Sequence, residues 1–299
     1  MSAPIILVTG GTGTLGRHVV DRLHQAGCEV RVLSRKQHED RDGVRFVVGD
    51  LATGEGLVPA LQSATVIVHC ASRQKGDAEA TRTLVRAAQA QPVPPHLVYI
   101  SIVGIDRVPF GYYRTKLAAE RIIAESGLPW STLRATQFHD LVLLAARVLA
   151  KPPVVLVPAG VLVQPVEADD VAARLVELAL DAPAGRVPDL GGPEVADVAA
   201  LLRAYLGATG SRRPVLPVRM PATRALRAGG LVLAEQPDSA GPGGSEQGGS
   251  GQGGSGAAGS GPGVRGRRTW AEFLAERVGR PADDARPAGV GRSAGAGRA

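Results

Sequence analysis

The chain is poor in several residue types that mark common protein classes. Only 3% of its 299 residues are aromatic, so a core drawn from its 44% hydrophobic residues must be mainly aliphatic. Its two cysteines, Cys28 and Cys70, match no metal-ligand spacing and are weak support for a disulfide. We therefore expect a globular protein with no metal site.

Long apolar runs and basic clusters are also missing. No stretch approaches the roughly 18 to 20 apolar residues of a membrane span, and the chain enters a predicted strand at Ile5 without a basic leader segment. The net charge of +6 suggests nucleic-acid binding, but the arginines are scattered among 28 acidic residues and no aromatic residues accompany a basic run. We expect a cytoplasmic protein with neither a nucleic-acid nor a membrane partner.

Apolar runs alternate with helical patterns over the first 190 residues. Most of the runs are continuously apolar, as in parallel strands that are buried on both faces. They are residues 5–9, 30–34, 45–48, 66–70, 97–101 and 131–135, and the main helical stretches are 15–25, 78–91, 114–126 and 168–180. This alternation predicts an α/β fold, a Rossmann-type doubly wound parallel sheet, with the ligand beyond the carboxyl ends of the strands.

A glycine-rich turn directly follows the first apolar run. It reads Thr9-Gly10-Gly11-Thr12-Gly13-Thr14-Leu15-Gly16, in which Gly11, Gly13 and Gly16 have the G-x-G-x-x-G spacing. Glycines permit the tight turn and a close approach of phosphate to the backbone, and the following helix directs its N–H groups at the phosphate. A surface turn is the alternative, but the flanking strand and helix favour a site for the pyrophosphate of a dinucleotide.

The end of the second strand bears on the choice of cofactor. NAD-preferring sites place an acidic residue there, whereas this chain has Ser34, Arg35 and Lys36 and no acid until Glu39. A guanidinium pairs well with the 2′-phosphate of NADP. We therefore expect NADP(H) in preference to NAD(H), with a solvated surface arginine as the alternative for Arg35.

Further cofactor contacts are expected at the ends of the third and fourth strands. The carboxylate of Asp50, which Leu51 follows, could accept a hydrogen bond from the adenine amino group or cap the next helix. The small residues Cys70, Ala71 and Ser72 would let the cofactor pass close to the fourth strand.

Tyr112 and Lys116 form a Y-x-x-x-K pair, which shares one face of a helix. An ammonium group near a phenol stabilises the phenolate, as acid–base catalysis requires. The chain has only four lysines, so a lysine at this spacing is informative, although a packed tyrosine and a solvated lysine are the alternative. Ser101 is the candidate for polarising a substrate carbonyl, and Gln137, Phe138 and His139 are expected to line the substrate pocket.

Together these motifs resemble the short-chain dehydrogenase/reductase superfamily. Three segments are similar to its atypical, NmrA-like NAD(P)-binding branch: residues 99–106, Tyr113-x-x-Lys116-x-x-x-Glu120, and residues 126–136. The resemblance covers about residues 4–235 and the helix near Trp270. It implies a Rossmann-type sheet, bound NAD(P) and often a reductase or epimerase-like activity, although some members of the branch sense the cofactor.

The chain departs from the superfamily pattern in two respects. Active members commonly add an asparagine to the Ser, Tyr and Lys, and this chain contains no asparagine. Ser101 also lies eleven residues before Tyr112, closer than in the short members, and either Tyr112 or Tyr113 could face the nicotinamide.

We therefore predict an oxidoreductase that transfers hydride between NADP(H) and a small carbonyl, quinone or related metabolite. Tyr112 would donate the proton, and Ser101 would orient the substrate oxygen. Lys116 would lower the pKa of Tyr112 and bind the ribose of the cofactor. A non-catalytic NADP(H) sensor is the alternative, and a nucleotide-sugar epimerase or dehydratase is a weaker one. Helices on the faces of the sheet could pair two subunits as a homodimer.

The pattern changes after residue 190. We expect an NAD(P)-binding domain over residues 1–190, a small, mostly helical cap over 191–235 and 264–280, a flexible Gly/Ser-rich loop over 236–263 and a disordered tail over 281–299. A free coil of that loop's length would hold its ends roughly 25 to 30 Å apart. Trp270, Phe273, Leu274 and Val278 form one helical stripe, which we expect to dock on its own domain, with a partner interface as the alternative.

Overall fold

The structure is a computed structural model that describes residues 3–72, 76–108, 111–219, 224–233 and 263–278. The predicted tail at 281–299 and all but the last residue of the predicted loop at 236–263 lie outside the described residues. In the part of the chain that is described, no helix is long and apolar enough to cross a membrane.

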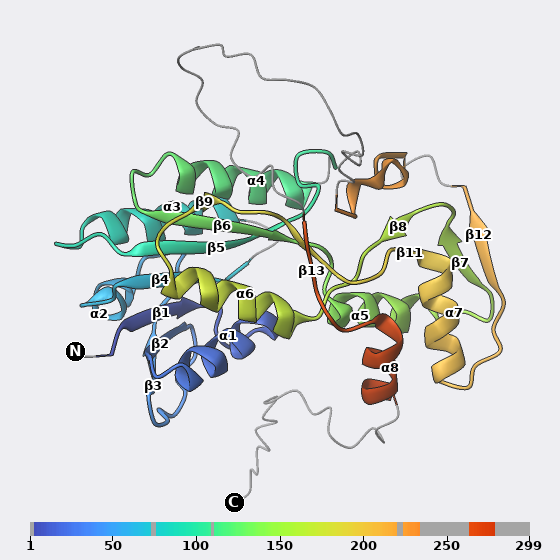
Figure 1. Ribbon diagram of the computed structural model, residues 1–299, viewed down its shortest axis with the longest axis horizontal. Helices are drawn as coiled ribbons and strands as arrows, with labels where there is room; N and C mark the ends of the chain where they lie inside the picture. Colours follow the sequence, from blue (N-terminus) through green and yellow to red (C-terminus); the bar gives the residue numbers. More distant parts are fainter. Residues whose placement is uncertain (1–2, 73–75, 109–110, 220–223, 234–262, 279–299) are drawn as a thin grey trace, which may run out of the picture.

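A parallel sheet forms the centre of the molecule (Figure 1). Its order is β3-β2-β1-β4-β5-β6-β10-β13, and β9 pairs with β6. The strands are β1 (Ile5–Thr9), β2 (Glu29–Ser34), β3 (Val44–Val48), β4 (Val66–His69), β5 (His96–Ile102), β6 (Trp130–Ala135), β9 (Gly185–Arg186), β10 (Leu190–Gly191) and β13 (Val264–Arg265). The six predicted strands are confirmed to within one or two residues at their ends. The order reverses between β1 and β4, the position where folds of this kind bind their ligand.

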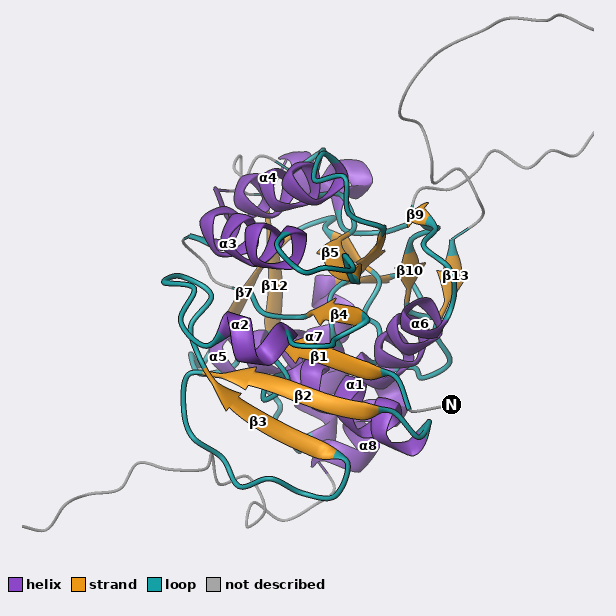
Figure 2. Ribbon diagram, turned by 90° about the vertical axis from the view of Figure 1, so that its left-hand side faces the viewer, coloured by secondary structure: helices purple, strands orange, loops and turns teal. Residues whose placement is uncertain are grey.

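Helices cover both faces of this sheet, as Figure 2 shows. One face carries α1 (Thr14–Gln25) and α6 (Ala168–Leu180), and the other carries α2 (Leu57–Leu61), α3 (Asp77–Gln89) and α4 (Gly111–Ala124). Successive side chains of a strand point to opposite faces. In β1, accordingly, Ile6 and Val8 pack with α1 whereas Leu7 packs with α2 and α3. The doubly wound α/β fold is confirmed.

A smaller unit lies beyond the carboxyl ends of the strands, at the right of Figure 1. It contains α5 (His139–Leu149), α7 (Val198–Ala208), the π-helix η2 (Leu226–Gly230) and α8 (Trp270–Val278). Two strand pairs complete it: β7 (Val155–Pro158) with β12 (Val215–Val218), and β8 (Leu162–Val163) with β11 (Ala196–Asp197). The alternating burial of β7, in which Val155 and Val157 face α7, gives this unit its own apolar core.

The last described segment returns to the edge of the sheet. Val264 in β13 pairs with Leu190 in β10, and α8 then buries Trp270 and Phe273 together with Leu274. The predicted docking of this helical stripe on its own chain is confirmed. The side chain of Leu233 contacts Gly263, so the two ends of the intervening stretch lie together. The separation expected for a free coil concerns a loop whose first end lies outside the described residues, so it stays a prediction.

Candidate functional site

A cleft of about 850 Å³ opens at the carboxyl ends of β1 to β4, a size within the range of small-molecule and cofactor sites. It is lined by predicted cofactor residues from all four strand ends: Thr9, Gly10, Thr12, Gly13, Ser34, Arg35, Asp50, Leu51, Cys70, Ala71 and Ser72. Its lining also includes residues that were not predicted to contact the cofactor: Leu33, Lys36, His38, Gly49, His69, Asp77 and Ala80. The other predicted cofactor residues do not line the cleft: Thr14 is exposed beside it, and the buried ones are Gly11, Leu15, Gly16 and Lys116.

The glycine turn brings backbone segments into direct contact. Gly10 has a φ of +72°, and a Cβ there would lie only 2.6 Å from the backbone nitrogen of Ala71. A Cβ on Gly16 would overlap the carbonyl oxygen of Gly10, so only glycine lets α1 begin this close to the turn. Glycine thus lets this turn pack tightly against Ala71 and α1, and the turn forms a shallow cradle at the cleft that fits the close approach of a pyrophosphate.

The N-terminus of α1 faces this cradle without a side-chain cap. Its N-cap is Gly13, which has no side chain to accept a hydrogen bond from the first amides, and no acidic residue lies in its first turn. Helix N-termini attract anions through these amides and the positive end of the helix dipole. The local chemistry therefore suits a phosphate group.

The rim after β2 is basic. Ser34 Oγ accepts the N–H of Lys36 at 3.2 Å and lies 3.1 Å from His38 Nε2, which folds this segment into a tight turn. Arg35 is exposed on that turn and lines the cleft. Across the cleft, Asp50 Oδ1 accepts the N–H of Ala52 at 2.9 Å, so this carboxylate stabilises its own turn.

The two adjacent tyrosines have different surroundings. The hydroxyl of Tyr112 lies 2.6 Å from Oγ of Ser72, which lines the cleft, whereas the ring of Tyr113 packs against the core around α8. Burial raises the pKa of Tyr112, the hydrogen bond with Ser72 opposes that rise, and the charge of Asp77 adds to it. The expected lowering of this pKa by Lys116 is therefore not seen.

The Lys116 ammonium is directed into the protein. Its side chain is only 3% exposed, and Nζ lies 3.0 Å from the Tyr99 hydroxyl, 3.4 Å from Asp77 Oδ2 and 3.4 Å from the Ile100 carbonyl oxygen. Burial lowers the pKa of Lys116, and the charge of Asp77 opposes this effect. Asp77 and Tyr99 were missed from the sequence because no local pattern connects them to a lysine on another helix.

His69, which lines the cleft, is a second buried group that sequence reasoning missed. Its Nδ1 lies 2.7 Å from Thr9 Oγ1 and its Nε2 lies 3.3 Å from Thr81 Oγ1. Burial, assisted by the nearby Lys116 charge, lowers the pKa of His69 to about 3. The imidazole is therefore neutral at physiological pH and links β1, β4 and α3.

The Ser101 hydroxyl is buried at the end of β5. Its Oγ has no hydrogen-bond partner within the described part of the chain. A buried polar atom of this kind is costly and calls for an explanation. Ser101 does not line the cleft, so a substrate oxygen would have to reach behind the cleft wall to pair with this hydroxyl.

Two charged residues of the motifs at 113–120 and 126–136 hold α4 in place. Arg134 on β6 donates to both carboxylate oxygens of Glu120, at 2.8 and 2.7 Å, and to Asp106 at 3.2 Å. The guanidinium is only 6% exposed, so this bidentate pair is shielded from water. It fixes the helix that carries Tyr112 and Lys116.

The residues expected to form the substrate pocket lie elsewhere. None of them lines the cleft: Phe138 packs on the core beneath α1 and α6, and His139 is fully buried. The His139 ring lies 4.9 Å from the ring of Phe273, and its Nδ1 lies 3.5 Å from Glu167 Oε2. The structure places His139 in the interface with α8, because the terminal helix covers the start of α5.

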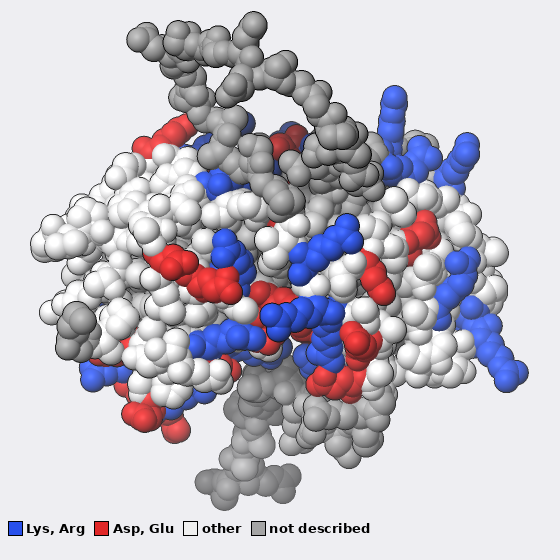
Figure 3. All heavy atoms as spheres, viewed as in Figure 1, with Lys and Arg blue, Asp and Glu red and all other residues white. Residues whose placement is uncertain are grey.

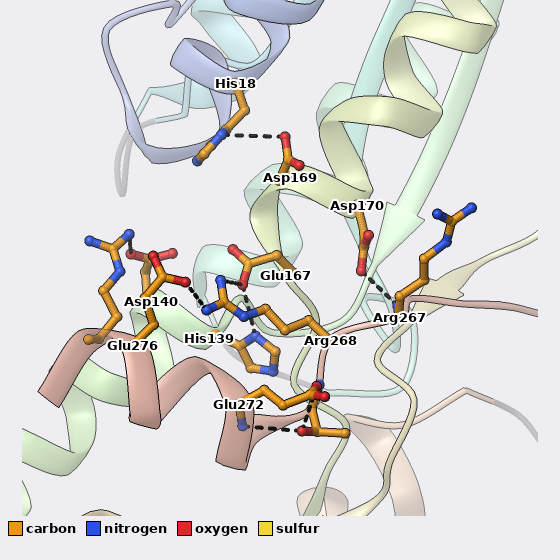
Figure 4. A network of polar contacts seen from close by, with 12 residues as sticks. His18, His139, Asp140, Glu167, Asp169, Asp170, Arg267, Arg268, Glu272 and Glu276 are labelled. Carbon is orange, nitrogen blue, oxygen red and sulfur yellow. Dashed lines mark hydrogen bonds and ion pairs between the residues drawn. The ribbon is translucent and has the colours of Figure 1, made fainter. Parts of the chain in front are cut away.

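An acidic cluster at the start of α6 anchors this terminal segment (Figure 4). Glu167 pairs with Arg268 at 3.1 Å, and Asp170 accepts the backbone N–H of Arg267 at 2.8 Å. Asp169 instead accepts two hydrogen bonds from Arg22 of α1, at 2.7 and 2.6 Å. These contacts account for the cluster as a structural junction. Figure 3 likewise shows acidic and basic side chains side by side across the middle of this face.

Comparison with known proteins agrees with this geometry. Residues 10–182 match the NAD(P)H-binding family. The chain is 30% identical over 150 residues to the photosystem II assembly factor Ycf39 of Cyanophora paradoxa, covering 45% of this chain and 46% of that protein. It is 27% identical over 182 residues to Ycf39 of Trieres chinensis, covering 56% of this chain and 57% of that protein. The chain thus spans about half the length of these curated relatives.

Solved structures share the fold over most of the chain. The NADPH complex of the quinone oxidoreductase QOR2 from Escherichia coli has a TM-score of 0.64 and 21% identity, covering 76% of this chain and 90% of that one. A nucleoside-diphosphate-sugar epimerase from Staphylococcus aureus has a TM-score of 0.64 and 20% identity, covering 77% and 92%. The chain belongs to the NAD(P)H-binding family and shares the Rossmann-type fold of these two solved structures.

Proposed function

We propose that this protein is an NADP(H)-dependent oxidoreductase that acts on a small carbonyl compound, a quinone or a related metabolite. The observation that carries the proposal is that one cleft combines the glycine cradle, the basic turn of Arg35 and Ser72, whose hydroxyl lies 2.6 Å from that of Tyr112. When bound, NADPH would supply the hydride. The cradle and the N-terminus of α1 would hold its pyrophosphate, and Arg35 would pair with its 2′-phosphate.

The chain's own groups would handle the proton and the substrate oxygen. Because the pKa of Tyr112 is raised by burial, its phenol keeps its proton at neutral pH and can donate that proton from Oη. The Ser101 hydroxyl would orient the substrate oxygen, which would satisfy its buried Oγ. Lys116 would bind the ribose hydroxyls of the nicotinamide half.

Tyr112 is tested by the oxidation of NADPH against a panel of aldehydes, ketones and quinones. We expect Tyr112→Phe to lower kcat by about 100-fold or more, since general acid catalysis contributes roughly that much, with the Kd for NADPH unchanged. Tyr113→Phe is the matched control, because its ring packs against the α8 core. Equal turnover by Tyr112→Phe and the unaltered protein would contradict the proposed role.

The preference for NADP(H) is tested at Arg35. Replacement by aspartate should raise the Kd for NADPH by about tenfold or more, since a charged pair would become a repulsion, and should leave the Kd for NADH unchanged or lower. Arg82→Asp is the control, because Arg82 is exposed on α3 and does not line the cleft. An unchanged ratio of the two Kd values would remove the assignment.

A non-catalytic NADP(H) sensor is the second candidate function. It is favoured by the contacts of Lys116 with Asp77 and Tyr99 and by the naming of two relatives as assembly factors. A sensor would bind NADPH, show no turnover with or without Tyr112, and bind a protein partner with an affinity that differs between NADPH and NADP⁺. The weaker alternative, an epimerase, predicts that a nucleotide sugar is converted while NAD is bound and that the bound NAD shows no net oxidation or reduction.

A further inference from the structure

A buried ion pair lies between the cleft and the helix that carries Tyr112. Asp77 Oδ2 is 3.4 Å from Lys116 Nζ, and each side chain is only 3% exposed. Asp77 is the first residue of α3 and also lines the cleft. The pair therefore joins the cofactor cleft to α4 across the top of the sheet.

Tyr99 completes the surroundings of the ammonium from below. Its hydroxyl accepts a hydrogen bond from Nζ at 3.0 Å, and the ammonium lies 4.7 Å from the centre of its ring. The Ile100 carbonyl oxygen lies 3.4 Å away. Partners thus come from α3 and from β5, and together they restrict Nζ to one place.

Burying an ammonium group is costly unless an opposite charge and hydrogen bonds compensate for the lost water. A lysine side chain is also long and flexible, so its amine has no fixed position without such partners. Both requirements are met here by Asp77 and Tyr99. Neither residue belongs to the Y-x-x-x-K pair that points to Lys116 in the sequence.

We propose that Asp77, together with Tyr99, is a positioning residue that keeps Lys116 protonated and holds its Nζ beneath the cleft for the ribose hydroxyls of NADP(H). This inference rests on the proposed function, in which Lys116 contacts that ribose. Asp77 acts through Lys116 and takes no proton in the reaction. Its carboxylate supplies the charge that compensates for the buried ammonium.

The proposal predicts how NADPH affinity depends on pH. Burial lowers the pKa of Lys116, and the charge of Asp77 raises it again. Lys116 carries its charge below this pKa and loses it as the pH rises through the pKa. The part of the NADPH affinity that depends on the ammonium is therefore also lost as the pH rises. Removing Asp77 therefore moves the loss to lower pH. The groups that face the amine are Asp77 from α3, Tyr99 from β5, His69 and Cys70 from the end of β4, and Glu120 from α4.

The experiment measures the Kd of NADPH by its fluorescence from about pH 7 to about pH 10, which spans the range of a lowered lysine pKa. Asp77→Asn keeps the shape of the side chain and removes its charge. We expect its affinity to fall at a pH about one unit lower than in the unaltered protein, with a Kd about tenfold higher at pH 9. Glu79→Gln is the matched control, since Glu79 is exposed in the same first turn of α3.

Two further variants separate the possible outcomes. If Lys116→Met weakens binding while Asp77→Asn follows the unaltered protein at every pH, the positioning role is overturned and the proposed contact of Lys116 stands. If Lys116→Met binds NADPH normally, the proposed contact itself fails. If Asp77→Asn does not fold, as judged by circular dichroism, Tyr99→Phe takes its place. We then expect the loss of NADPH affinity in Tyr99→Phe to begin at a lower pH than in the unaltered protein, with a Kd about threefold higher at pH 9. An unchanged pH dependence would overturn the proposal.

Discussion

The helices α1 and α6 lie on the same face of the sheet, and their N-termini differ in what is available to pair with their first backbone amides. Each helix begins with backbone amides that have no partner within the helix. At α6, Asp169 and Asp170 occupy the first turn, whereas α1 has no acidic residue there and only Gly13 as its N-cap. The two helices are also in contact, because Arg22 of α1 pairs with Asp169.

The difference separates a structural helix start from one that suits a ligand. The carboxylates at the start of α6 complement its dipole. They accept hydrogen bonds from the side chains of Arg22 and Arg268 and from the backbone N–H of Arg267. The start of α1 instead follows the glycine turn that lines the cleft. A helix N-terminus that has no acidic side chain of its own can bind the negative charge of a phosphate.

The largest expected effect comes from breaking the start of α1. Gly16→Ala would place a Cβ on the carbonyl oxygen of Gly10, so the turn and the helix must move apart. We expect the Kd for NADPH to rise by about 100-fold or more and the free energy of unfolding to fall by roughly 3 kcal/mol. Isothermal titration calorimetry and urea unfolding would measure the two effects.

Gly27→Ala is the control for that substitution. Gly27 follows the other end of α1 with a φ of +79°, and no atom lies within 4 Å of a Cβ built there. It should cost about 1 kcal/mol of stability through backbone strain alone, with NADPH binding unchanged. Similar NADPH affinities for both variants would show that the start of α1 does not bind the cofactor.

An intermediate effect should follow from giving α1 the chemistry of α6. Thr14 is exposed in the first turn of α1, and Thr14→Asp adds the negative charge that this turn lacks. The helix should gain about 0.3 to 1 kcal/mol of stability, while the Kd for NADPH should rise about tenfold because two negative groups compete for one N-terminus. Opposite changes in melting temperature and affinity are the result to look for, and unchanged affinity contradicts the comparison.

The smallest effect is expected from removing a charge at α6. Arg22 lowers the pKa of Asp169 through a side-chain hydrogen bond, and burial acts against it. The pair therefore stabilises the fold at pH values above about 3.8, the ordinary pKa of the carboxyl, and this stabilisation is lost as the pH falls through the lower folded value. Because the side chains are 36% and 43% exposed, Asp169→Asn should cost only about 1 kcal/mol at pH 7.

Urea unfolding between about pH 2 and pH 7 would test this prediction. The variant should lose stability near neutrality and differ little from the unaltered protein at the lowest pH. Its NADPH affinity at pH 7 should match that of the unaltered protein. A loss of affinity would mean that the start of α6 also contributes to the cleft.

The parts of the molecule that were predictable depend on neighbours in the sequence. The turn at 9–16 signals its own geometry, because glycine spacing, strand and helix follow one another directly. Burial on both faces made the strands continuously apolar, so their positions were predicted to within one or two residues. The stripe from Trp270 to Val278 predicted its docking because a helical period reveals a buried face.

The parts that were missed depend on partners far apart in the chain. Lys116 contacts Asp77 on another helix and Tyr99 on a strand, and the sequence around these residues does not indicate the contacts. His139 was expected at a pocket, but α8, more than a hundred residues later, covers it. A local pattern records which side chains are buried or polar, and it carries no information on which distant element contacts them.

The contact between Leu233 and Gly263 has a thermodynamic consequence for the stretch that joins them. The entropy cost of closing a flexible stretch grows with the logarithm of its length, so doubling it costs only about 0.6 kcal/mol. Since the sheet edge already holds both ends together, residues could be added or removed between them without moving β13 or α8. The fold therefore depends on where the chain leaves at Leu233 and returns at Gly263, and we expect a sequence inserted between these two residues to leave the cofactor cleft unchanged.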